Sequence, residues 1–72
     1  MKEVSFGMFL RSLREENGLS QAQLGRLAGV SDKAVSKWES GASDPSTSNL
    51  LALAKLFGID AKELLDETKN AE

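Results

Sequence analysis

Residues 21–40, QAQLGRLAGVSDKAVSKWES, leave few folds open to this chain. Apolar residues recur there at helical spacing on both sides of one glycine; they are Leu24, Ala28, Val30, Val35 and Trp38. Gly25 is a small residue where two helices can cross, and Gly29 can adopt the positive φ that a tight turn requires. The pattern predicts two short helices that pack against a third, which is a helix-turn-helix.

The other apolar residues predict further helices and no strands. They recur at helical spacing before residue 17 and again between residues 50 and 57, at Phe6, Phe9, Leu10, Leu13, Leu50, Leu53, Ala54 and Phe57. Asn17-Gly18 and Gly58 are expected to end these two helices. A last short helix is expected to begin at Asp60 and to carry Leu64 and Leu65.

Serine residues stand at two of the expected helix starts. Ser20, with Gln23 three residues later, predicts a capping box, and Ser31 is expected to cap the next helix. Together the elements predict an all-α, compact five-helix bundle that forms a single domain over residues 1–72. We expect its core over roughly residues 5–66, followed by a frayed acidic tail at 67–72.

Composition excludes several classes of protein. The 72 residues include no cysteine and no histidine, so neither disulfides nor a Cys/His metal site can support the small core. With no phosphate-binding loop either, we expect neither an enzyme nor a cofactor. No segment has the apolar length of a signal peptide or a bilayer span, so a cytoplasmic protein is expected.

Three segments resemble the Cro/C1-type (XRE) helix-turn-helix family. They are LREENGLSQ at 13–21, VSDKAVSKWESG at 30–41 and LLALAKLFGID at 50–60, together with Pro45 in the loop 41–46. The resemblance covers roughly residues 5–66. It implies a lambda-repressor-like fold and sequence-specific binding to double-stranded DNA by a transcriptional regulator or repressor.

The helix expected at about residues 32–40 has one polar side and one apolar side. On a helical wheel, Val35 and Trp38 lie opposite the polar residues Asp32, Lys33, Ser36, Lys37 and Ser40. We expect Trp38 in the core and the polar side in the major groove, where lysine can donate to guanine and aspartate can accept from cytosine. A solvated surface is the alternative, and Asp32 can instead interact with the helix dipole.

Three further residues are candidates for functional or structural roles: Gln21, Arg14 and Glu39. Gln21 is expected to begin its own helix, where its amide and backbone N–H can meet a DNA phosphate, although it can also be an ordinary first-turn residue. The resemblance implies the same phosphate contact. It also implies an ion pair between Arg14 and Glu39 that joins the first helix to the end of the recognition helix, the alternative being two exposed charges.

Several features depart from the family's usual pattern. A net charge of −2 and a pI near 5.1 also differ from the basic balance that is usual for proteins that bind nucleic acid, although the five acidic and two basic residues at 58–72 leave about +1 for the rest of the chain. Residues 41–44 lack the basic side chain with which many family members contact a DNA phosphate, and Thr47 stands where the family usually has an apolar residue. Gly25 replaces alanine, so we expect Gly25→Ala to stabilise the domain.

These observations leave two functions open. The leading hypothesis is a regulator that binds a palindromic operator as a weak homodimer, with the contact between subunits near residues 59–64. The alternative is an antitoxin-like or protein-interaction module that binds DNA weakly and has a protein partner.

Overall fold

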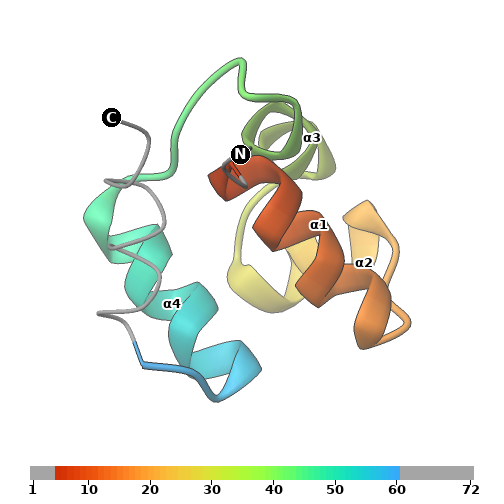
Figure 1. Cartoon of the computed structure of the whole chain (residues 1–72), viewed down its shortest axis with the longest axis vertical. Coiled ribbons are helices and arrows are strands. Elements are labelled where there is room, and N and C mark those ends of the chain that lie inside the picture. Colours follow the sequence, from red (N-terminus) through yellow and green to blue (C-terminus); the bar gives the residue numbers. More distant parts are fainter. Residues whose placement is uncertain (1–4, 61–72) are drawn as a thin grey trace, which may run out of the picture.

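A computed structural model describes residues 5–60 of the chain. They form four helices: α1 (Phe6–Glu16), α2 (Gln21–Ala28), α3 (Asp32–Ser40) and α4 (Thr47–Phe57) (Figure 1). No strand occurs in this part of the chain, which confirms the all-α helix-turn-helix prediction. The predicted fifth helix, with Leu64 and Leu65, lies outside the described residues.

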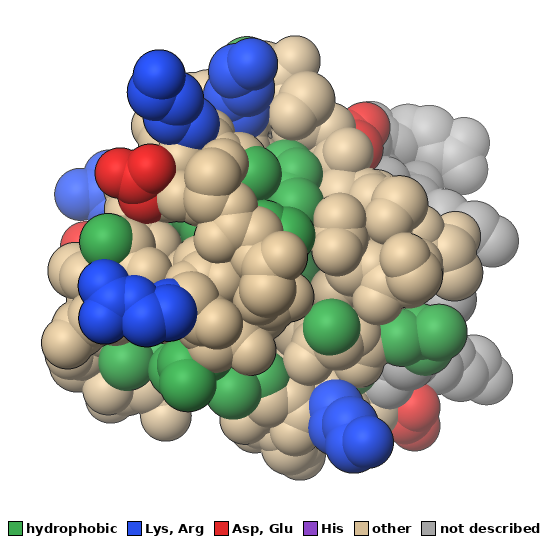
Figure 2. Space-filling view, turned by 180° about the vertical axis from the view of Figure 1, so that it is seen from behind, with side chains coloured by type: hydrophobic (Ala, Val, Ile, Leu, Met, Phe, Trp, Pro, Cys, Tyr) green, Lys and Arg blue, Asp and Glu red, His purple; other side chains and the backbone are tan. Residues whose placement is uncertain are grey.

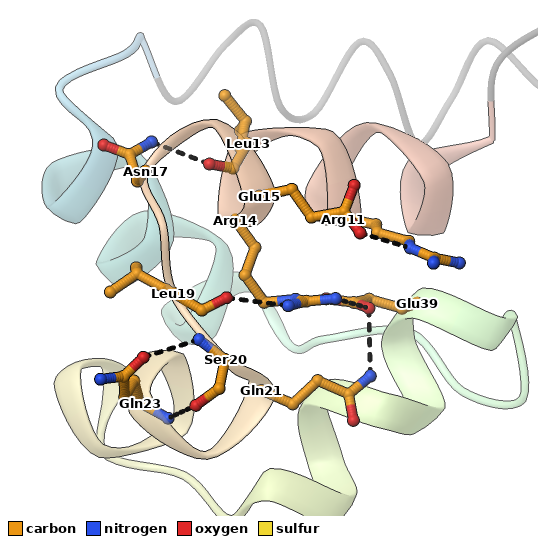
Figure 3. Close-up of polar contacts among 10 residues, drawn as sticks. All are labelled: Arg11, Leu13, Arg14, Glu15, Asn17, Leu19, Ser20, Gln21, Gln23 and Glu39. Carbon is orange, nitrogen blue, oxygen red and sulfur yellow. Dashed lines mark hydrogen bonds and ion pairs between the residues drawn. The ribbon is translucent and has the colours of Figure 1, made fainter.

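Each of the four helices begins at a serine that caps it. The hydroxyl oxygens of Ser5, Ser20, Ser31 and Ser46 accept the backbone N–H of the residue three positions later. At Ser20 the predicted capping box is complete, because the Gln23 side chain accepts the Ser20 N–H at 2.8 Å (Figure 3). These caps satisfy backbone groups that a helix leaves unpaired at its start.

The core lies where the four helices meet. α3 packs against both α1 and α2, and α4 packs against α2. Eight of the apolar residues predicted from helical spacing are buried: Phe6, Leu10, Leu24, Val35, Trp38, Leu50, Leu53 and Ala54. The others predicted with them are only partly buried: Phe9, Leu13, Ala28, Val30 and Phe57. Trp38 is only 5% exposed, which confirms its place in the core. Among the described residues, no helix is long and apolar enough to cross a membrane.

Two glycines allow helices to approach α3 closely. A methyl group on Gly25 would lie 2.7 Å from the carbonyl oxygen of Val30, in the turn that leads into α3. A methyl group on Gly7 would lie 2.6 Å from the carbonyl oxygen of Trp38, inside α3. The expected stabilisation by Gly25→Ala is therefore wrong, because the close backbone outweighs the gain in helix propensity.

We expect Gly25→Ala to lower the melting temperature of the domain. Gly7→Ala should lower it further, because the backbone that its methyl group would meet is closer than at Gly25 and lies within a helix. Overpacking of this kind costs about 1–3 kcal/mol. Ser12→Ala, at an exposed position of α1, is the control and should change little. A higher melting temperature for Gly25→Ala would show that the turn before α3 moves at little cost.

Candidate DNA-binding surface

The outward side of α3 consists of short polar and basic side chains. Asp32, Lys33, Ser36, Lys37 and Ser40 are all exposed, whereas Val35 and Trp38 are buried on the opposite side. Ser31 caps the start of α3 by accepting the Ala34 N–H at 3.1 Å. The helix therefore presents one continuous polar side while its apolar side fixes it to the core.

Two of these exposed residues, Ser40 and Asp32, also interact with the backbone of their own helix. The Ser40 hydroxyl donates to the Lys37 carbonyl at 3.2 Å and accepts the Ala42 N–H at 3.4 Å, so it helps to close the end of the helix. Asp32 lies in the first turn, where the helix dipole favours a negative charge. Contacts from either residue to DNA remain predictions.

The Arg14 and Glu39 side chains lie together, as the family resemblance implies. The Arg14 Nε–H donates to Glu39 Oε2 at 2.6 Å, and Arg14 Nη2 donates to Oε1 at 3.1 Å (Figure 3). The two side chains are only 12% and 6% exposed, so solvent screens this pair less than it screens a surface pair. The alternative of two exposed charges does not describe this structure.

Arg14 also holds the segment between α1 and α2. Its Nη1 donates to the carbonyl oxygen of Leu19 at 2.8 Å, one residue before the Ser20 cap. Its hydrogen bonds to Glu39 raise the pKa of the Arg14 guanidinium above its ordinary value, although burial opposes the shift. The arginine therefore stays charged at any pH at which the protein is handled.

Gln21 makes a contact that sequence reasoning missed. Its Nε2 donates to Glu39 Oε1 at 3.1 Å, which joins the first residue of α2 to the end of α3 (Figure 3). The two residues are 18 positions apart, so no local spacing signals the contact. The side chain is half-buried rather than freely extended toward a ligand.

Charge is nearly balanced over the described residues, which include six Lys or Arg and six Asp or Glu residues. On the face that Figure 2 shows, two Lys or Arg side chains lie side by side at the top and the others lie apart from them, so this face carries no broad basic patch. The loop from α3 to α4 contributes no basic residue. Any binding of an anionic polymer therefore depends on a few well-placed groups.

Residues 5–60 contain no cluster of metal-ligating side chains. No group of three or more His, Cys, Asp or Glu residues lies close enough together to hold a metal ion in this part of the chain. A hollow of about 210 Å³ on the outside of α2 is lined by Leu19, Gln23, Arg26 and Leu27 and is open to solvent. The residues that line it include no carboxylate.

The profile of the helix-turn-helix family matches residues 10–64. The chain belongs to this family, in its Cro/C1-type branch. Repressor protein C2 of Salmonella phage P22 is 43% identical over 65 residues, which cover 90% of this chain. The transcriptional activator BcrR of Enterococcus faecalis is 39% identical over 62 residues, or 86% of this chain. The chain spans only 30% of the length of either relative.

The fold also matches solved structures of such regulators. A crystal structure of the P22 c2 repressor in complex with a synthetic operator superposes with a TM-score of 0.80 at 36% identity. The match covers 85% of this chain and 92% of that one. The P22 c2 repressor therefore shares the all-α helix-turn-helix fold of this protein.

A double-mutant cycle on stability tests the energetic role of the Arg14–Glu39 pair. We expect Arg14→Ala and Glu39→Ala each to cost about 3–5 kcal/mol, because each leaves a buried partner unpaired. The double variant should cost clearly less than the sum of the two single variants.

The exposed Arg11–Glu15 pair, 64% and 55% exposed, provides the control cycle. Its coupling should be only about 0.3–0.5 kcal/mol. Additive effects at Arg14 and Glu39 would show that the two side chains do not stabilise each other in solution.

Proposed function

We propose that this protein binds specific sequences of double-stranded DNA and regulates transcription. The observation that supports this proposal is the exposed polar side of α3, a helix that the buried Arg14–Glu39 pair holds in place. A helix held in this way can enter the major groove, where each base pair presents a distinct set of donors and acceptors. The similarity to a repressor that binds an operator supports the same orientation here.

The proposed roles of the α3 residues follow from their chemistry. Lys33 and Lys37 donate to guanine O6 and N7 or to phosphate, and Ser36 bonds to a base edge or to the backbone. Asp32, in the first turn of α3, accepts a hydrogen bond from cytosine N4. Ser40, whose hydroxyl is engaged with Lys37 and Ala42, lies at the margin of the surface.

A phosphate contact at the start of α2 complements these base contacts. The Gln21 amide has a second N–H besides the one that bonds to Glu39, and the helix start adds backbone N–H groups and a positive dipole end. Because phosphates are the same in every sequence, a contact of this type sets affinity and register rather than sequence preference.

We further propose a weak homodimer on a palindromic operator. Its contact would include residues 59–64, most of which lie outside the described part of the chain. A protein that acts on bacterial DNA would reside in the cytoplasm. Catalysis, a cofactor and a metal have no role in this proposal.

Selection from a random pool of DNA duplexes tests the function directly. We expect the retained sequences to share a palindromic consensus. The affinity of the protein for them should fall steadily as the salt concentration rises, because each phosphate contact releases counterions. Retention without a consensus, together with tight binding to a protein encoded next to this one, would favour the antitoxin-like alternative.

Substitutions on α3 test which residues read the bases. We expect Lys37→Ala and Ser36→Ala to weaken binding to the selected operator by about 1–3 kcal/mol each if they contact base edges. Lys55→Ala removes an exposed lysine from the last turn of α4 and is the matched control. Unchanged operator affinity for both α3 variants would place the DNA elsewhere on the protein.

Sedimentation measurements test the proposed dimer. Apolar side chains from all four described helices form the domain's own core, and the large apolar side chains that stay exposed among the described residues are Met8, Leu27 and Leu51. A large obligate interface needs more apolar area than three side chains provide. We expect a monomer without DNA at micromolar concentration and two copies on the palindromic duplex. A tight dimer in the absence of DNA would contradict this expectation.

A further inference from the structure

Gln21 and Glu39 join the two helices of the helix-turn-helix at their open ends. α2 and α3 are connected at one end by the turn around Gly29, where the Gly29 backbone has a φ of 78°. Gln21 is the first residue of α2 and Glu39 the penultimate residue of α3, so the bond between them closes the opposite end. Within residues 5–60, no other side-chain hydrogen bond connects α2 to α3.

The chemistry at this contact fixes how the amide is oriented. Glu39 Oε1 accepts from both Arg14 Nη2 and Gln21 Nε2, each at 3.1 Å, while Oε2 accepts from Arg14 Nε. A carboxylate only accepts hydrogen bonds, so the Gln21 nitrogen and not its oxygen must face it. Arg14 therefore connects Glu39 to α1, and Gln21 connects the same carboxylate to α2.

We propose that Gln21 is a positioning residue for sequence recognition, acting through Glu39 on the orientation of α3. This inference rests on the proposed function. If Gln21 only contacted a phosphate, its contribution to binding affinity would be the same for every DNA sequence. A residue that sets the angle between α2 and α3 instead matters most when the α3 side chains must meet particular base edges.

The two roles predict different results for the ratio of operator affinity to affinity for a scrambled duplex. Gln21→Met keeps a side chain of similar length but removes the amide, both its NH2 donor and its carbonyl acceptor. If Gln21 positions α3, we expect this variant to lower the ratio about tenfold, with most of the loss in operator binding. If Gln21 only contacts phosphate, both affinities fall together and the ratio is unchanged.

Two further variants separate positioning from a general weakening of α2. Gln21→Lys supplies a new donor to Glu39, so we expect it to keep most of the ratio while binding to both duplexes becomes tighter. Gln23→Ala removes the capping box at the same helix end without touching Glu39. It should lower stability but leave the ratio unchanged.

The experiment uses the full chain, the operator obtained by selection and a scrambled duplex of equal length, at one salt concentration. Circular dichroism at the assay temperature first establishes that each variant is folded. An unchanged ratio for Gln21→Met, or an equal loss for Gln21→Met and Gln21→Lys, would overturn the positioning role while leaving the proposed function intact. Failure of the selection to yield any consensus would overturn the proposed function itself, and the positioning role with it.

Discussion

The Arg14–Glu39 ion pair holds together the parts of the molecule that would meet DNA. Both side chains are largely removed from solvent, and the guanidinium forms two parallel bonds to the carboxylate while a third reaches the Leu19 carbonyl. Two parallel bonds fix direction as well as distance. Burial of charge is costly, so such a pair contributes more to the unique placement of α3 than to net stability.

Geometry has to compensate for weak electrostatics in this protein. The described residues carry balanced charge, and the loop after α3 offers no basic group to the phosphate backbone. Long-range attraction to DNA is therefore small, and the few contacts that form must be accurate. In the proposed function, the buried ion pair, the capped start of α3 and the bond from Gln21 would together provide that accuracy.

Close approach of the backbone is the second requirement for this placement. Gly7 lies against the backbone of α3 and Gly25 against the turn before it, and a side-chain carbon at either position would meet carbonyl groups. Helix propensity predicts a gain from alanine at Gly25 because it considers the helix in isolation. Packing reverses the sign, since the nearest atoms are backbone atoms that cannot move aside without moving α3.

The sequence by itself determined the elements and the side that each buries. Apolar spacing, the serine caps at Ser20 and Ser31 and the glycine turn act over a few residues, so their outcome follows from local geometry. Only the tertiary structure decided the contact between Gln21 and Glu39 and the close approaches at Gly7 and Gly25. Both depend on the distance and angle between neighbouring elements, which the whole core sets. No spacing along the chain encodes those quantities.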